Sequence, residues 1–268
     1  MLRIALTVIL LLALCACARP AADRQFAPGP WNRGELARLI TELRPLPPGE
    51  RIVHISHLFL GAPYAANTLR GGPQQAEQLV VNLAEFDCFT LLDTIEALRR
   101  AATPADFPEQ LKQVRYRGGK VAYASRRHFF SDWVAADSAG MSDVTAAVGQ
   151  GRARVVAKQL NQKEDGSLWL PGLPVTGRDV TYIPTVKIDR VVLSALQAGD
   201  YVGIYAAHQG ADVSHTGLIV KTGARVLLRH ASSSPGVRRV VDVDLLAYLQ
   251  GKPGLVVYRA SRNSRLSK

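Results

Sequence analysis

The chain has 268 residues, 47% of them hydrophobic, and its 33 Lys and Arg residues against 22 Asp and Glu residues give a net charge of +11. This length allows one large domain or two small ones, and the ordinary apolar content excludes a chain that is disordered throughout. The basic charge suits either a nucleic acid or an anionic polymer of the cell envelope.

The first 16 residues have the layout of an export signal. Arg3 precedes an apolar run that ends in small residues, which is the order seen in secretory signal peptides. The run is too short to span a bilayer as a mature helix. Because an aliphatic residue (Leu14) and a small one (Ala16) stand three and one positions before Cys17, we expect cleavage after residue 16 and lipidation of Cys17. An ordinary secretory signal with an incidental cysteine pair is the alternative.

Export favours anionic envelope material, such as wall peptides or lipid phosphates, over nucleic acid as the partner. Residues 17–34 are rich in proline and small residues, which is typical of a tether. Ala18 occupies the position after the lipidated cysteine, and by resemblance to Gram-negative lipoproteins it favours the outer membrane. We therefore expect a periplasmic lipoprotein with one domain over residues 35–268. No sequence feature indicates an oligomeric state.

Helical elements come before strands along the chain. Apolar spacing predicts helices over residues 34–44, 51–60, 84–101, 107–116 and 126–136. Short β-rich runs predict strands over residues 200–206, 213–221, 225–231, 239–243 and 255–260. Helices followed by antiparallel strands indicate an α+β fold rather than a repeated βαβ unit. Residues 103–180 are predicted to form a largely helical insertion.

Cys88 is the one cysteine left for chemistry, since Cys15 leaves with the leader and Cys17 carries the lipid. In an oxidising compartment a lone thiol is usually a modification site or a reactive nucleophile. Asp87 is a favoured N-cap residue, which places Cys88 in the first turn of a helix. The helix dipole should make the thiol ionise more easily, whereas the charge of Asp87 opposes this. The competing interpretation is a buried cysteine that acts as a small hydrophobe.

Two histidines, His215 and His230, lie on adjacent predicted strands. If Thr222 and Gly223 form a two-residue turn, His215 directly faces His230 on one side of the sheet. One imidazole can then pair with the Cys88 thiolate while the second orients the first. For each histidine alone, a structural role is the alternative.

Other candidates lie upstream of the strands. Arg127, His128 and Trp133 could line a substrate cleft, with charge for carboxylates and a ring for a sugar; the alternative places the aromatic rings in the core and the arginine in solvent. His54 and His57 are three residues apart, but no carboxylate or thiol accompanies them at ligand spacing, so we expect a helix face and no metal site there.

The motifs occur in an order that resembles the NlpC-like, papain-related cell-wall hydrolases, and more closely their N-acetylmuramoyl-L-alanine amidase-like branch. The resemblance covers about residues 50 to 260, with departures at Phe89 and at residues 65–67. It rests on these segments: Gly61-Ala62-Pro63-Tyr64, Val80-Val81-Asn82-Leu83, Phe86-Asp87-Cys88, Arg115-Tyr116-Arg117-Gly118-Gly119, Arg127-His128-Phe129-Phe130-Ser131-Asp132-Trp133, Leu196-Gln197-Ala198-Gly199-Asp200-Tyr201, Ser214-His215-Thr216-Gly217-Leu218-Ile219 and His230-Ala231.

This resemblance implies a papain-like α+β fold of the NlpC type and a peptidoglycan hydrolase that needs no metal or cofactor. Cys88 would attack the amide between N-acetylmuramic (or anhydro-muramic) acid and L-alanine, His215 would shuttle the proton, and His230 would hold His215. Tyr64 and Asp87 are then expected beside the oxyanion or the substrate.

Three alternatives stay open at this stage. Cleavage between D-glutamate and a diamino acid is the runner-up within the same superfamily. A wall-binding lipoprotein with an inactive site would keep the fold without the chemistry. A zinc site formed by Cys88, His215 and His230 is the third.

Overall fold

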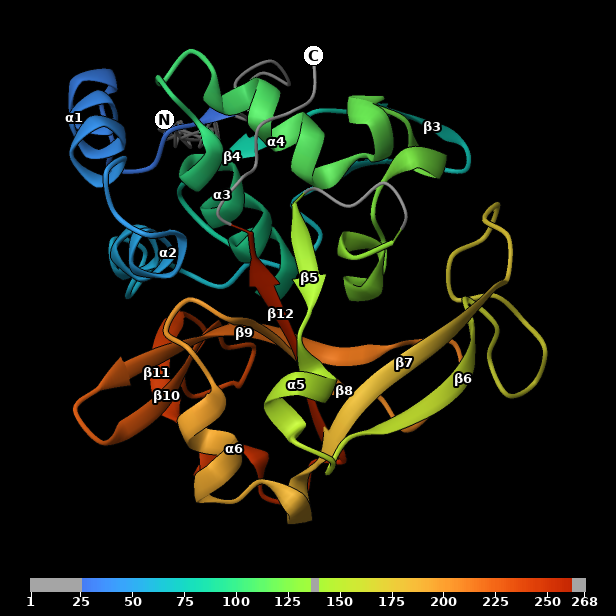
Figure 1. Cartoon of the computed structure of the whole chain (residues 1–268). Helices are drawn as coiled ribbons and strands as arrows, with labels where there is room; N and C mark the ends of the chain where they lie inside the picture. The colour runs from blue at the N-terminus through green and yellow to red at the C-terminus, as the bar shows by residue number, and fades with distance from the viewer. Residues whose placement is uncertain (1–25, 136–139, 262–268) are drawn as a thin grey trace, which may run out of the picture.

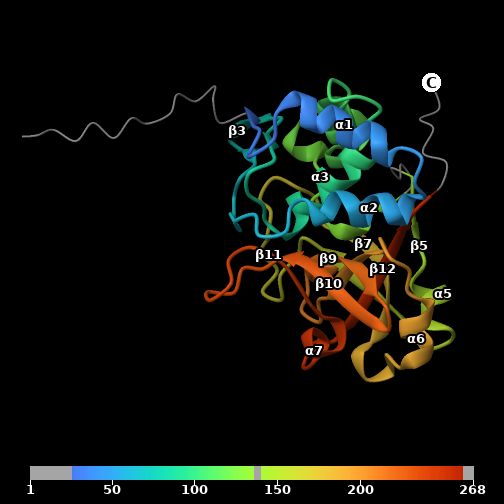
Figure 2. The ribbon, with the colours of Figure 1, turned by 90° about the vertical axis from the view of Figure 1, so that its left-hand side faces the viewer.

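The computed structural model describes residues 26–135 and 140–261, so the expected signal peptide, Cys17 and most of the tether lie outside the described residues. A helical layer covers one side of a large antiparallel sheet, and short helices lie against the other side (Figures 1 and 2). The α+β class predicted from the sequence is therefore correct. In the described part of the chain, no helix is both long enough and apolar enough to cross a membrane.

The helices match the sequence pattern well at the N-terminal end of the domain. The helical layer consists of α1, α2, α3 and α4, and the short helices α5, α6 and α7 interrupt the strands. Their bounds are Arg33–Leu43 (α1), Pro48–His57 (α2), Cys88–Arg100 (α3), Phe107–Arg115 (α4), Thr145–Gly149 (α5), Arg190–Ala195 (α6) and Leu245–Leu249 (α7).

The main sheet has eight strands in the order β11-β10-β9-β8-β12-β7-β6, and β5 pairs with β12 beside this path. Every pairing in it is antiparallel. Its strands are Met141–Asp143 (β5), Arg154–Leu160 (β6), Thr176–Pro184 (β7), Tyr201–Tyr205 (β8), Val213–Thr222 (β9), Arg225–Ala231 (β10), Val240–Asp244 (β11) and Gly254–Ala260 (β12). Two minor pairs join Phe26–Ala27 (β1) to Val81–Asn82 (β4) and Arg70–Gly72 (β2) to Gln75–Gln78 (β3).

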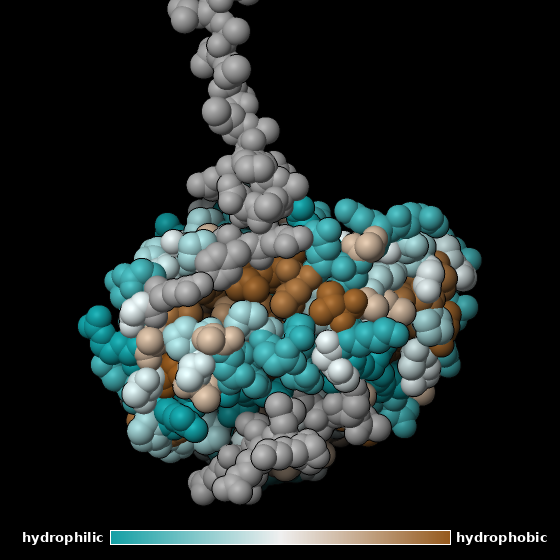
Figure 3. Space-filling model, turned by 90° about the horizontal axis from the view of Figure 1, so that it is seen from above, coloured by the Kyte–Doolittle hydropathy of each residue, from teal (hydrophilic) through white to brown (hydrophobic). Residues whose placement is uncertain are grey.

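Both faces of the central strands are buried, and alternate residues belong to different cores. In β9, Leu218 and Val220 pack with the helical layer, whereas Ile219 packs with α5, α6 and α7. This follows from the period of two along a strand. On the outer side of the helical layer, mostly hydrophilic side chains surround a band of apolar ones (Figure 3).

The helix predicted over residues 126–136 does not form. The backbone of Arg126 bridges Tyr116, and the N–H of Arg127 donates to the carbonyl of Arg115 at 2.8 Å, so this part is extended beside the end of α4. Only a short 3₁₀ turn, Phe130–Trp133, follows. Tertiary pairing therefore overrides the helical spacing of the aromatic residues.

The insertion over residues 103–180 is only partly helical, which corrects the sequence prediction. It contains α4 and α5, but its second half is the β6–β7 hairpin, paired from Arg154 opposite Tyr182 to Leu160 opposite Thr176. Most residues of these two strands are exposed or half-buried. Charged side chains such as Lys158 and Arg178 break the apolar alternation that would have indicated strands.

The helix that carries Cys88 is fixed to its surroundings by polar contacts. Arg115 of α4 pairs with Asp93 at 2.9 Å, and Tyr201 of β8 donates to Glu96 at 3.0 Å. Thr216 of β9 donates its hydroxyl to the Cys88 carbonyl at 2.9 Å. This last contact ties the first turn of α3 to the strand that carries His215.

Candidate active site

Cys88 is the first residue of α3, as the sequence predicts. Asp87 caps the helix: its Oδ1 accepts hydrogen bonds from the N–H groups of Phe89 and Thr90 at 2.9 and 2.7 Å. The Thr90 hydroxyl in turn accepts from the Asp87 N–H at 3.0 Å, which completes a capping box. The cap uses the favoured N-cap chemistry of aspartate.

The Cys88 thiol is harder to ionise than the helix position alone suggests. Burial raises its pKa, and the charge of Asp87 raises it further. The N–H and hydroxyl of Thr216 act in the opposite direction but do not prevail. The expectation of easier ionisation is therefore wrong for the free protein, because desolvation of the thiolate outweighs the helix dipole.

His215 and His230 meet as predicted, but by a different register. Thr222 pairs with Arg225 and Leu218 with Arg229, so the turn residues are 223 and 224. His230 thus continues this register opposite Gly217 rather than His215. The pairing is thus shifted by two residues from the predicted one, which keeps both imidazoles on the same face of the sheet. His215 and His230 are then diagonal neighbours across the two strands, and long side chains at such positions can still touch. His215 Nε2 lies 2.7 Å from His230 Nδ1.

This contact constrains the protons on the two ring nitrogens. One of the two nitrogens must carry a proton and the other a lone pair. If His215 accepts a proton on Nδ1, its Nε2–H donates to His230 Nδ1. Burial, followed by the nearby charge of His230, lowers the pKa of His215 to about 3. Burial also lowers the pKa of His230 to about 4, although Asp242 opposes this. Both rings are thus neutral at pH 7.

Tyr248 of α7 is a site residue that sequence reasoning missed. Its ring centroid lies 5.0 Å from that of His230 and 5.9 Å from that of His215. Burial raises its pKa, and the proximity of Cys88 raises it further. No motif marks this tyrosine in the sequence; it reaches the site because α7 packs against β10 and β11.

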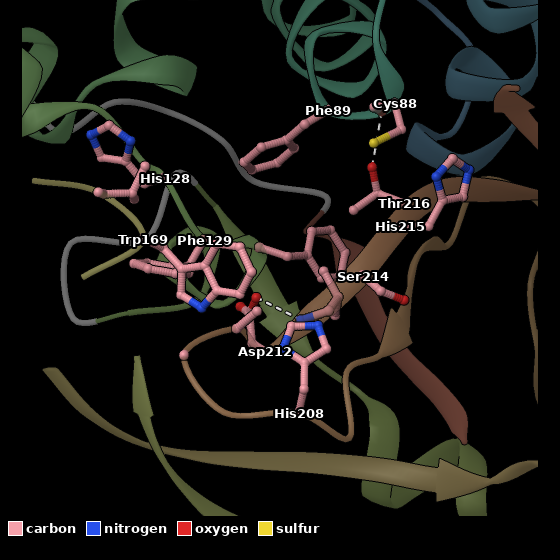
Figure 4. A pocket seen from close by; sticks show the side chains of 15 residues that line it. Cys88, Phe89, His128, Phe129, Trp169, His208, Asp212, Ser214, His215 and Thr216 are labelled. Atoms are coloured by element: carbon pink, nitrogen blue, oxygen red, sulfur yellow. Dashed lines mark hydrogen bonds between the residues drawn. The ribbon is translucent and has the colours of Figure 1, made fainter. Parts of the chain in front are cut away.

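Cys88 and His215 line one cavity of about 420 Å³. Figure 4 shows Cys88, Thr216 and His215 at one end of it. Its far end holds Trp169, His208 and Asp212 (Figure 4). A cavity lined by a thiol and by an imidazole that is hydrogen-bonded to a second imidazole provides a nucleophile and a base for attack on a carbonyl compound.

Tyr64 lies beside the nucleophile, as expected. Its segment runs parallel to Phe86, and the Ala65 N–H donates to the Phe86 carbonyl at 2.9 Å. Burial raises the pKa of Tyr64, and the proximity of Cys88 and Asp87 adds to this. The guanidinium of Arg238 lies 4.8 Å from the centre of its ring.

Of the other predicted substrate-binding residues, only His128 lines the main cavity. The buried Arg127 guanidinium donates to the carbonyls of Gln113 at 3.0 Å and Tyr116 at 2.8 Å, so it supports the end of α4. Trp133 is 1% exposed and packs against Tyr201 in the core. A cleft-lining role for Trp133 is therefore wrong.

The remaining two candidates take different positions. The His128 Nε2–H donates to the Tyr123 carbonyl at 2.8 Å, and burial lowers the pKa of His128. Asp87 uses Oδ1 for the helix cap and lines a small neighbouring cavity of about 150 Å³. Asp87 lies beside the nucleophile, as the sequence predicts. Its hydrogen bonds are those of a helix cap.

The structure offers little support for the zinc alternative. Within residues 26–135 and 140–261, no three His, Cys, Asp or Glu side chains are arranged to hold a metal ion. His215 and His230 also direct ring nitrogens at each other rather than at a common point. His54 and His57 are exposed on α2.

Solved structures with this architecture include proteins described as amidases. An N-acetylmuramoyl-L-alanine amidase from Bacteroides uniformis is 26% identical, with a TM-score of 0.66 over 80% of this chain and 98% of that one. A putative xylanase from Bacteroides fragilis is 27% identical, with a TM-score of 0.65 over 77% and 99%. A Legionella pneumophila protein of the DUF1460 family shares the fold at 22% identity and a TM-score of 0.70, over 84% and 93%.

The fold is thus that of the amidase-like α+β proteins, with helices packed on an antiparallel sheet. Residues 54–255 match the model of the N-acetylmuramoyl-L-alanine amidase-like family, and the chain belongs to that family. The resemblance inferred from the sequence motifs is confirmed. No curated protein matches the chain significantly.

Proposed function

We propose that the protein is a cysteine amidase that cleaves the amide between N-acetylmuramic (or anhydro-muramic) acid and L-alanine in muropeptides. The observation that carries this proposal is that His215 lines one cavity with Cys88 and has its Nε2 2.7 Å from Nδ1 of His230. Membership in the amidase-like family supports the choice of bond. In this proposal the domain is a papain-like fold of the NlpC type.

The proposed mechanism uses these three residues. His215 takes the thiol proton through Nδ1 while its Nε2–H is held by His230, and Cys88 Sγ bonds to the lactyl carbonyl carbon. The Cys88 backbone N–H and the Tyr64 hydroxyl stabilise the oxyanion. The proton then passes from His215 to the leaving amine of L-alanine as the C–N bond breaks, and water hydrolyses the thioester. None of these steps requires a metal or cofactor.

Product identity tests the bond. Purified protein is incubated with a muramyl tetrapeptide and with the same tetrapeptide without the sugar, and the products are identified by mass spectrometry. We expect intact tetrapeptide from the first substrate and no cleavage of the second. Release of L-alanyl-D-glutamate from either would replace the amidase proposal by the endopeptidase alternative.

Substitutions test the catalytic set. We expect Cys88→Ala to abolish turnover, His215→Ala to be nearly as severe, and His230→Ala to be milder, because orienting a base contributes less than the base itself. Losses on the order of 10³-fold or more are typical for a nucleophile or base. His54→Ala, an exposed histidine on α2, is the matched control. Substantial activity in folded Cys88→Ala would contradict the thiol mechanism.

We also propose that the mature protein is a periplasmic lipoprotein, anchored in the outer membrane through Cys17. A lipid chain holds the domain at a membrane face where muropeptides are present, with no nucleic acid involved. Cys17→Ser should abolish incorporation of labelled fatty acid and release the protein from the membrane fraction. Continued labelling and membrane partitioning of this variant would contradict the anchor.

A further inference from the structure

The cavity has an aromatic platform at the end away from Cys88. Trp169, in the loop between β6 and β7, keeps 53% of its surface exposed. The indole lies against the cavity and against a second hollow of about 480 Å³ next to it. An exposed tryptophan at such a position is a surface on which an apolar face of a ligand can stack.

The platform is held in place by its own loop. Buried Asn161 accepts a hydrogen bond from the Leu170 N–H at 2.7 Å and donates to the Leu173 carbonyl at 2.9 Å. A Cβ on Gly210 would stand 2.5 Å from the indole Cδ1 and Nε1, so only glycine allows the ring to lie there. Lys163 Nζ is 5.0 Å from the ring centre. The indole is therefore a fixed surface.

A carboxylate lies at the same end of the cavity. Asp212 is 2% exposed, and its two oxygens accept hydrogen bonds from the N–H groups of Ser131 at 2.6 Å and Val213 at 2.7 Å. Each carboxylate oxygen retains acceptor capacity beyond one such bond. His208 lies beside the indole, with ring centroids 5.9 Å apart. A flat ring with adjacent acceptors suits a pyranose, which offers an apolar face and hydroxyl donors.

Two cationic side chains lie close to tyrosines that neighbour Cys88. Exposed Arg238 lies over the Tyr64 ring, and Lys252 lies 5.8 Å from the ring centre of Tyr248. The sugar half of a muropeptide presents hydroxyl groups and no carboxylate, because its lactyl carboxyl forms the scissile amide. The peptide half carries carboxylates, which the side chains of Arg238 and Lys252 attract.

We propose that the Trp169–His208–Asp212 end binds the sugar ring of the substrate, so that the peptide leaves the cavity on the side of Arg238 with the scissile amide at Cys88. This assignment rests on the proposed function. It makes Trp169 a specificity-determining residue that contacts the sugar through ring stacking, and Asp212 the acceptor for its hydroxyl groups.

Two substrates with the same scissile amide test the assignment. Muramyl dipeptide carries the sugar, and D-lactoyl-L-alanyl-D-isoglutamine lacks it. We expect Trp169→Ala to lower kcat/KM for muramyl dipeptide at least about tenfold more than for the lactoyl dipeptide, since only the first loses a stacking partner. Trp169→Phe should restore most of the difference. Val186→Ala, at a residue 90% exposed, is the matched surface control. Equal losses on both substrates, or no loss on either, would overturn the assignment.

A binding measurement separates this inference from the proposed function. Cys88→Ala protein is titrated with muramyl dipeptide and with the lactoyl dipeptide in a calorimeter. We expect tighter binding of the sugar-bearing ligand and loss of that preference in Cys88→Ala/Trp169→Ala. If product analysis shows cleavage inside the peptide, the proposed function fails, while this preference still tests the sugar site. Equal affinity for both ligands would overturn the sugar site whichever bond is cut.

Discussion

At the scale of single residues, the site pairs a neutral thiol with a neutral imidazole. Burial raises the pKa of Cys88 and lowers that of His215 to about 3. A preformed thiolate–imidazolium pair is therefore disfavoured in the free protein. In the proposed mechanism, His215 takes the thiol proton when substrate occupies the cavity, as a general base does.

Asp87 should limit the reactivity of the thiol through its charge. Asparagine caps a helix about as well as aspartate but carries no charge. Asp87→Asn should therefore lower the pKa of Cys88 and speed its alkylation by iodoacetamide at pH 7, measured at Cys88 by peptide mapping.

The matched control is Asp189→Asn, because Asp189 is also an N-cap and accepts from the Val191 and Val192 N–H groups of α6. It should leave the alkylation rate of Cys88 as in the wild type. Slower alkylation of Asp87→Asn with an intact fold would contradict the charge effect and indicate that Asp87 assists the thiolate.

At the scale of elements, local patterns predicted the parts of the site that depend on one segment. The cap at Asp87 placed Cys88 correctly, and alternation in β9 and β10 placed both histidines on one face. The exact turn was wrong by one residue, since Gly223 supplies its positive φ of 58° at the first turn position rather than the second. The resulting two-residue shift in pairing left both histidines on the same face, because side chains alternate with a period of two along a strand. Tyr248 could not be placed, because long-range packing brings it to the site.

Gly217 should be the residue that allows the histidine pair to approach. A Cβ there would lie 2.7 Å from the Arg229 carbonyl oxygen and 3.1 Å from His230 Cβ. Backbone atoms cannot move aside without separating β9 from β10. Gly217→Ala should thus cost about 1–3 kcal/mol of unfolding free energy, as overpacking does, and lower kcat.

Urea unfolding and steady-state kinetics measure the two effects. Gly72→Ala in β2 is the control, because nothing lies within 4 Å of a Cβ at that position. Wild-type kcat and stability in Gly217→Ala would contradict this prediction and show that β9 and β10 can accommodate a methyl group at this position.

At the scale of the molecule, the site forms where the two layers meet. The helical layer supplies Cys88, the sheet supplies His215 and His230, and the β6–β7 loop supplies Trp169. The α+β class was predictable because apolar spacing changes once along the chain. The β6–β7 hairpin was not, since its strands are polar and partly exposed. The end of β7 also pairs with β12, at Ile183 and Pro184.

The buried imidazole pair should make stability depend on pH. In the unfolded chain histidine titrates near about 6.5, whereas the folded pKa values are about 3 for His215 and about 4 for His230. Between these limits the unfolded state binds protons that the native state does not. Above about pH 7 the two histidines are neutral in both states, so their titration does not lower the free energy of unfolding. As the pH drops through 6.5 toward 4, the unfolded chain takes up protons and the free energy of unfolding falls.

His230→Gln isolates this contribution, because it removes one titrating group and the neighbouring charge that lowers the pKa of His215. Burial raises the pKa values of Asp93 and Asp212, so these carboxyl groups change stability with pH in the opposite direction. They are present in both the wild type and His230→Gln, so their effect cancels in the difference between the two stabilities. From urea midpoints and m-values at pH 7, 6 and 5, we expect the stability of the wild type relative to His230→Gln to fall on acidification, by on the order of 1–2 kcal/mol. His54→Gln on α2 should follow the wild-type curve. Parallel curves for wild type and His230→Gln would mean that the native imidazole pair takes up a proton as readily as the unfolded chain.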